Sequence, residues 1–202
     1  SVLSLCGDVP AAESSSGAYC TMGVDTGKDL HVVILRDERN DTGAKRHLIH
    51  VAVCHDFGEL DTIMAQFAVA RCVIDALPET HATREFAKRH PGRVFMNFFN
   101  EHQRGSLNWD RKAMIVQGNR TEGLDTSRAA IRDRKVVLPR RSALMEMFAK
   151  HMAADAKVLD EDADTGTKKY RYIRTGENHF SLAFTYAWLA ASNRRRVGTW
   201  GR

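Results

Sequence analysis

The spacing of apolar residues changes near residue 56, and this change limits the folds that the chain can adopt. Before it, short apolar runs at residues 18–25, 31–36 and 47–54 are separated by polar turns. Apolar runs of this length that are bounded by turns are typical of β-strands. Because the connections are short, we expect the three strands to pair as an antiparallel meander.

After the meander, helical spacing alternates with short apolar runs. Apolar side chains recur at helical intervals over residues 57–67, and a second helix is predicted over residues 78–88. The apolar runs at residues 71–77 and 94–99 are typical of strands buried in the middle of a sheet. The order strand, strand, strand, helix, strand, helix, strand predicts an α/β fold. We expect a mixed five-stranded sheet, a three-strand antiparallel meander plus parallel strands, flanked by helices.

The rest of the chain predicts more helices and an additional hairpin. Residues 113–116 are a candidate further strand, and helices are expected over residues 121–134 and from residue 142 onward. Residues 158–173 contain two short runs around an Asp-Thr-Gly-Thr turn, which predicts a C-terminal β-hairpin. A last helix is expected over residues 178–191, because its apolar residues form a stripe at helical spacing.

Length and composition indicate one ordinary domain. The chain has 202 residues, of which 43% are hydrophobic, so it can bury a core. Residues 1–18 are small and polar and predict a linker, the domain is expected over residues 19–192, and a basic tail follows at 193–202. We expect neither a secretory leader nor a membrane-spanning helix, which needs about 18 apolar residues. Because no Met begins it, we interpret the chain as a piece of a longer polypeptide.

Basic residues gather in several clusters, although the net charge is only +5. Clusters of this kind in one small domain favour a polyanionic partner. If the partner is a nucleic acid, contacts to phosphates carry no base information, so low sequence specificity is expected. The residues predicted to make such contacts are Arg84, Lys88, Arg120, Arg140, Arg141, Lys168, Lys169 and Arg171.

Two carboxylates stand at the ends of apolar strands. Asp25 closes the run Met-Gly-Val-Asp, and Asp75 closes the run Val-Ile-Asp. If both strands are central in one sheet, the two side chains meet at the same edge. A carboxylate there is costly unless it is paired or binds a cation. Paired carboxylates suit Mg²⁺ or Mn²⁺, and two such ions can assist phosphodiester cleavage.

Five short motifs occur in order along the chain: MGVDTG at 22–27, VIDALPE at 73–79, NRTE at 119–122, VLP at 137–139 and NHFSLAFTYAW at 178–188. In this order they resemble a known family, the C-terminal nuclease domain of the large terminase subunit of tailed bacteriophages. The resemblance runs from about residue 19 to residue 191.

The resemblance implies a ribonuclease-H-like sheet and a metal-dependent endonuclease that cuts double-stranded DNA concatemers during genome packaging. By resemblance, Asp25 and Asp75 are catalytic metal ligands for Mg²⁺ or Mn²⁺, with two ions expected. The implied partners are double-stranded DNA, an ATPase motor domain of the same chain, the small terminase subunit and the portal. The implied location is the host cell cytoplasm.

The third acidic ligand of the family falls on Asn178, and this is a departure from the family pattern. An amide oxygen lacks charge and holds a divalent ion more weakly, and asparagine is also a preferred helix N-cap. We predict that Asn178 or its neighbour Glu177 completes the site, with Glu79 and Asp29 as further candidate ligands. His179 is a candidate orienting residue. Replacing Asn178 by aspartate is expected to raise cleavage at a small cost in stability, since both residues cap helices.

Two alternatives remain open at this point. The chain could be a non-catalytic DNA-binding or docking domain that keeps the fold without its third acid. It could also be another ribonuclease-H-like nuclease of the resolvase or integrase type, although the NRT and LP motifs argue against this.

Overall fold

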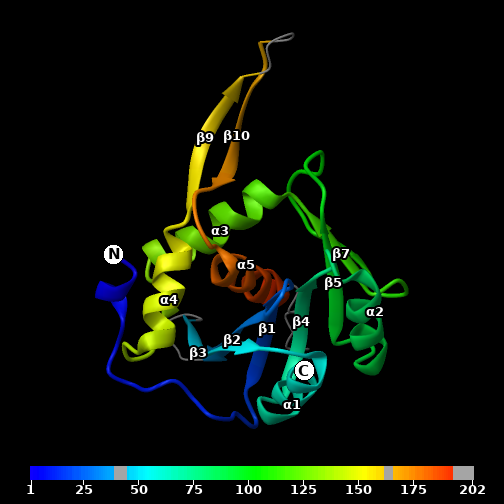
Figure 1. Cartoon of the computed structure of the whole chain (residues 1–202), viewed down its shortest axis with the longest axis vertical. Coiled ribbons are helices and arrows are strands. Elements are labelled where there is room, and N and C mark those ends of the chain that lie inside the picture. The colour runs from blue at the N-terminus through cyan, green and yellow to red at the C-terminus, as the bar shows by residue number, and fades with distance from the viewer. Residues whose placement is uncertain (39–44, 162–165, 193–202) are drawn as a thin grey trace, which may run out of the picture.

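The computed structural model describes residues 1–38, 45–161 and 166–192. An eight-stranded sheet forms its centre, in the order β6-β7-β5-β4-β1-β2-β3-β8. Figure 1 shows its longer strands with the helices around them. The strands are β1 (Tyr19–Asp25), β2 (Leu30–Glu38), β3 (Lys45–Cys54), β4 (Val69–Asp75), β5 (Val94–Phe99), β6 (Asn108–Asp110), β7 (Ile115–Gly118) and β8 (Val136–Val137).

The predicted α/β fold and meander are confirmed, and the strand number is corrected. Strand β2 pairs antiparallel with β1 on one side and with β3 on the other, whereas β4, β5 and β7 run parallel to β1. The sheet has eight strands and not five, because β6, β7 and β8 extend its two ends. Strands β6 and β8 have three and two residues, too few for a periodic pattern in the sequence.

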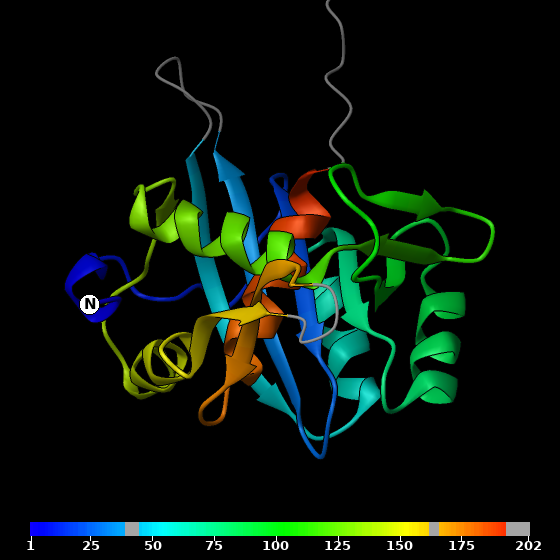
Figure 2. The same ribbon diagram turned by 90° about the horizontal axis from the view of Figure 1, so that it is seen from above.

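Five helices cover the sheet in two layers (Figure 2). Residues of α1 and α2 pack on one face, while residues of α3, α4 and α5 pack on the other. Side chains of Asp56, Asn119 and Ser142 accept hydrogen bonds from the first turns of α1, α3 and α4, which explains where these helices begin. The helices are α1 (Phe57–Gln66), α2 (Thr80–Arg89), α3 (Arg120–Arg132), α4 (Ala143–Met152) and α5 (His179–Ser192).

The predicted C-terminal hairpin is also confirmed. Strands β9 (Asp155–Glu161) and β10 (Lys168–Arg174) form a separate two-stranded ribbon that projects from the body (Figure 1). Its base is tied to α3, because the Tyr172 hydroxyl donates to Asp125 at 2.8 Å and Arg120 donates to the Tyr172 carbonyl at 3.2 Å.

The segment predicted as a linker runs along the domain. It contains a short 3₁₀ turn, η1 (Leu3–Leu5), and its backbone bonds to the body at several points. Gly7 donates to the Leu138 carbonyl at 3.1 Å, and Ala12 donates to the Ile49 carbonyl at 2.7 Å. The predicted tail at 193–202 lies outside the described residues. Within the described ranges, no helix is long and apolar enough to cross a membrane.

Helix α5 approaches β1 so closely that position 23 has room only for glycine. A Cβ built on Gly23 would lie 1.9 Å from the Ala183 carbonyl oxygen and 2.2 Å from the Ala187 nitrogen. Both are backbone atoms, so neither can move as a flexible side chain would. Thr21 adds a hydrogen bond from its hydroxyl to the Ala187 carbonyl at 3.1 Å. This contact sets the position of α5 over the carboxyl end of β1.

Gly23→Ala should destabilise the domain by at least about 2 kcal/mol, because the added methyl overlaps backbone atoms that are fixed by helix hydrogen bonds. Urea unfolding followed by circular dichroism measures the change. Gly27→Ala is the matched control, since the nearest atom to its Cβ is the Asp29 carbonyl oxygen at 3.7 Å. Equal stability of the two variants would contradict the close contact.

Candidate functional site

Asp25 and Asp75 close two neighbouring strands at the same edge of the sheet. Strands β1 and β4 pair in parallel with Val24 opposite Ile74, so the residue after each is an aspartate. In-register neighbours on parallel strands point their side chains to the same face. Asp25 and Asp75 therefore end neighbouring strands at the same edge of the sheet and face the same side of it.

The Asp25 carboxylate is almost completely buried, with 3% of the residue exposed. Burial raises its pKa, while a hydrogen bond from His179 and the positive charges of Arg174 and Arg120 act in the opposite direction. The Asp25 Oδ2 to His179 Nδ1 distance is 2.8 Å. Asp25 thus keeps a partner for its charge even though water is largely excluded.

Asp75 is partly buried and carries the more perturbed carboxylate. Burial raises the pKa of Asp75 to about 6, and the neighbouring Asp25 charge adds to this rise. The Leu77 backbone N–H donates to Asp75 Oδ1 at 3.2 Å, and the buried Tyr186 hydroxyl also bonds to the carboxylate. A partly buried carboxylate that also experiences the charge of a second acid is a group that a divalent cation stabilises.

Three histidines gather beside Asp25. His31 lies opposite Asp25 in the β1–β2 pairing, and its ring stacks on the His179 ring with centroids 4.6 Å apart. The His151 ring lies 5.7 Å from the His31 ring. Ligand atoms of Asp25, His31 and His179 all lie within 4.8 Å of one another, so they form a candidate metal site.

The histidines differ in their affinity for protons. Burial lowers the pKa of His31 to about 4, and the charges of His179 and His151 lower it further. The Asp25 carboxylate raises the pKa of His179 through the hydrogen bond between them. At neutral pH His31 is therefore a neutral imidazole, while His179 is the partner that balances Asp25.

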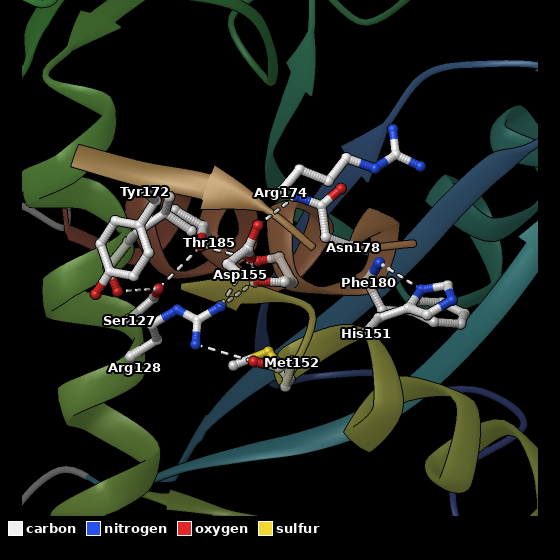
Figure 3. A network of polar contacts seen from close by, with 12 residues as sticks. Ser127, Arg128, His151, Met152, Asp155, Tyr172, Arg174, Asn178, Phe180 and Thr185 are labelled. Carbon is white, nitrogen blue, oxygen red and sulfur yellow. Dashed lines mark hydrogen bonds and ion pairs between the residues drawn. The ribbon is translucent and has the colours of Figure 1, made fainter. Parts of the chain in front are cut away.

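Asn178 belongs to a different network, which Figure 3 shows. Its Nδ2 donates to Asp155 Oδ1 at 2.6 Å, and the Asp155 side chain is fully enclosed. Arg128 forms an ion pair with Asp155 Oδ2 at 2.8 Å, and the Ser181 hydroxyl donates to the same oxygen at 2.9 Å. Asn178 is thus the neutral donor that a buried carboxylate requires.

The remaining candidate ligands lie around this centre or away from it. Glu177 is largely exposed and lies 3.8 Å from the His151 ring, and Asp29 bonds to His55 at 2.9 Å. Both border a pocket of about 390 Å³ that is also lined by the three clustered histidines. Glu79 is exposed at the start of α2 and makes no capping hydrogen bond there.

Four of the eight predicted phosphate-contacting residues form ion pairs with acidic side chains of the chain. Such exposed pairs are weak, so they leave the basic side chains free to exchange partners. Arg120 differs, because it bonds to the ribbon backbone beside Asp25, and Arg140 bonds to the Asp8 carbonyl. Arg84 lies on α2 and Lys169 on β10. The acid–base pairs are Lys88 with Glu85, Arg141 with Glu146, Lys168 with Glu161 and Arg171 with Asp160.

Sequence reasoning missed His31 and Asp155. The signal for His31 was present, because antiparallel pairing across the turn at 26–30 sets it opposite Asp25. Asp155 gave no local signal, since its partners Arg128 and Asn178 are more than 20 positions away in the sequence.

The contact of Asn178 with Asp155 leads us to expect a larger stability cost for an aspartate at 178 than helix capping alone suggests. The expectation from the sequence considered only the helix cap, whereas the buried Asp155 carboxylate faces the Asn178 side chain. Asn178→Asp should destabilise the protein by roughly 3 kcal/mol at pH 8, because two carboxylates would then face each other without water. Repulsion raises the folded-state pKa of the pair, so the penalty should shrink as pH falls through that pKa.

Urea unfolding at pH 8 and pH 5 measures this effect. Asn100→Asp is the matched control, because the Asn100 side chain uses its oxygen to accept from His102, which an aspartate can also do. A loss below about 1 kcal/mol at pH 8, equal to that of the control, would contradict the network.

Comparisons with known proteins agree on the fold. The large terminase nuclease of the thermophilic phage G20c, a structure with bound cobalt, matches with a TM-score of 0.58 and 14% identity, over 93% of this chain and 94% of that chain. The large terminase of a second thermophilic bacteriophage matches with a TM-score of 0.50 and 11% identity, over 92% of this chain and 43% of that chain.

This chain therefore spans less than half of that second large terminase. No protein-family model matches the sequence, and no curated protein matches it by sequence. The predicted ribonuclease-H-like fold is confirmed by the structural matches. The chain has the fold of the large-terminase nuclease domain, with a candidate Asp and His metal site at the carboxyl edge of its sheet.

Proposed function

We propose that this chain is the metal-dependent endonuclease domain of a viral DNA-packaging terminase, which hydrolyses double-stranded DNA with low sequence specificity. The observation that carries the proposal is the pairing of β1 with β4, which brings Asp25 and Asp75 together at one buried edge. The fold likeness to the G20c nuclease, which holds cobalt, supports it.

The residues at this edge suit a divalent cation. Carboxylate oxygens are the preferred ligands of Mg²⁺ and Mn²⁺. Burial is the main cause of the raised pKa of Asp75, and a bound cation would offset the cost of keeping this carboxylate charged. Asp25 and Asp75 would hold the metal. Two bound ions would supply an activated water and stabilise the leaving oxygen of the phosphodiester.

Other side chains orient the two carboxylates and place positive charge where the substrate would bind. His179 orients Asp25 through its hydrogen bond, and Tyr186 does the same for Asp75. Arg120 and Arg174 place positive charge near Asp25, where a DNA phosphate would approach. We propose Glu177 and Asp29 as outer ligands through water, since both border the neighbouring pocket.

The further partners are part of the same proposal. The large terminase of the second phage has also been determined in complex with ATP-γ-S, and this chain covers 44% of that protein. We propose that an ATPase motor domain belongs to the same polypeptide here, and that the small terminase subunit, the portal and DNA are partners in the host cytoplasm.

The docking alternative is favoured by one observation. Asn178 stands where the family has an acid, and its side chain is committed to Asp155. A domain with this arrangement would bind DNA without cutting it if two carboxylates are too few to retain the metal.

Asp25→Asn and Asp75→Asn should each lower plasmid nicking with Mn²⁺ by at least about a hundredfold, because each removes a charged ligand. Asp61→Asn is the matched control, since Asp61 pairs with Arg89 on the helices of the opposite layer. If the parent protein nicks DNA and all three variants nick it equally well, Asp25 and Asp75 are not the metal ligands. Binding of DNA without any nicking by the parent would establish the docking alternative.

Duplex binding should be weak and steeply dependent on salt. Each phosphate that the protein neutralises contributes about −0.9 to the slope of log affinity against log salt. Lys169→Gln should reduce the slope by about that amount, whereas Lys45→Gln, at the start of β3, should leave it unchanged. Fluorescence anisotropy on two unrelated duplexes measures both slopes. A salt-independent affinity would contradict a phosphate-binding surface.

A further inference from the structure

Nitrogen ligands stand next to the carboxylate that the proposed nuclease would use. Strand β2 supplies His31, and the first residue of α5 is His179. One ring nitrogen of each lies with an Asp25 oxygen in a group whose members are all within 4.8 Å of one another. Mg²⁺ prefers an all-oxygen shell, whereas imidazole suits later divalent metals.

The His31 ring has a buried polar atom without a hydrogen bond. Its Nδ1 is enclosed and has no partner among the described residues, and the residue is only 9% exposed. Buried polar groups are nearly always bonded, so an unsatisfied one calls for an explanation such as an ion. Among the three clustered histidines, His31 alone has such an atom in the part of the chain that the structure describes.

The other two histidines each have a hydrogen-bond partner for the Nδ1 atom of the ring. His151 Nδ1 lies 3.2 Å from the Phe180 backbone nitrogen and accepts its hydrogen, so that nitrogen serves the first turn of α5 (Figure 3). His179 bonds to Asp25 through Nδ1 and so keeps its ring beside the carboxylate. The histidines available to a cation shared with Asp25 are therefore His31 and His179.

Because the Asn178 side chain is hydrogen-bonded to Asp155, a cation beside Asp25 would depend more on the two imidazoles as ligands. The Asn178 amide nitrogen is held by Asp155, and that acid is itself paired with Arg128. Neither side chain adds negative charge beside Asp25. His31 and His179 both line a pocket of about 390 Å³, which has room for an ion and its waters beside the two rings.

We propose that His31 and His179 are metal ligands that act together with Asp25 and make the site prefer Mn²⁺ or Co²⁺ to Mg²⁺. The proposal rests on the proposed nuclease function for its context, because Asp25 is shared. The ligand atoms now lie within 4.8 Å of one another, and donors to a single ion would have to lie closer together than this limit. The two rings would therefore move slightly toward Asp25 if an ion bound there.

Pulsed electron paramagnetic resonance on the Mn²⁺-loaded parent chain tests nitrogen ligation without any substitution. We expect ¹⁴N modulation from directly bound imidazole, and we expect it to be replaced when the histidines are labelled with ¹⁵N. Absence of histidine nitrogen coupling with Mn²⁺ bound would overturn the proposal, whatever the activity.

Calorimetric titration with Co²⁺ and Mg²⁺ then assigns the ligands. His31→Leu should weaken Co²⁺ binding by at least about tenfold and change Mg²⁺ binding by less than about twofold. His179→Leu also removes the hydrogen bond that orients Asp25, so it should weaken the binding of both metals, and that of Co²⁺ more. His50→Leu is the matched control and should change neither, because His50 is a partly buried strand histidine that packs on Phe67. His31→Leu is decisive, since it leaves the Asp25–His179 bond in place. An equal loss for both metals, or no loss, would overturn the assignment.

The outcome is separable from that of the proposed function. If the parent protein nicks DNA with Mg²⁺ but shows no histidine nitrogen coupling, the proposal of histidine ligands is wrong and the nuclease proposal stands. If histidine nitrogen coupling is observed and the protein does not nick DNA at all, the metal site stands and the nuclease proposal is wrong.

Discussion

The close contact between α5 and β1 is the constraint on which the rest of the site depends. Because Gly23 has no side chain, the backbone of α5 rests directly on the strand that ends in Asp25. The first residue of the helix, His179, then reaches Asp25, and Tyr186 two turns later reaches Asp75. The acids are thus oriented by a helix and a sheet, which hold geometry better than loops do.

Three acids in this region are balanced in three different ways. Asp155 has a permanent cation in Arg128 and two neutral donors, so its charge is satisfied within the fold. Asp25 shares a hydrogen with His179, a partner that can also give it up. Asp75 has donors but no cation of its own among the described residues, and its pKa is raised to about 6. The first arrangement is structural, and the other two leave room for an external charge.

The sequence predicted what depends on local spacing and failed where contacts are long-range. The meander, the helices and the ends of the strands at Asp25 and Asp75 follow from apolar periodicity and from the rule that parallel strands end together. The structure confirmed these elements. The meaning of Asn178 could not be predicted, because it depends on Asp155, a residue on another element. His31 was an intermediate case, since its register was readable but its stacking on His179 was not.

The ends of the main sheet have a consequence for association with other chains. Its outermost strands, β6 and β8, have only three and two residues, so each offers few free backbone groups to an added strand. The projecting ribbon differs, because β9 and β10 have seven residues each and pair only with one another among the described strands. Each strand of the ribbon is therefore longer than either outermost strand of the main sheet, and it offers a longer edge for the addition of a foreign strand.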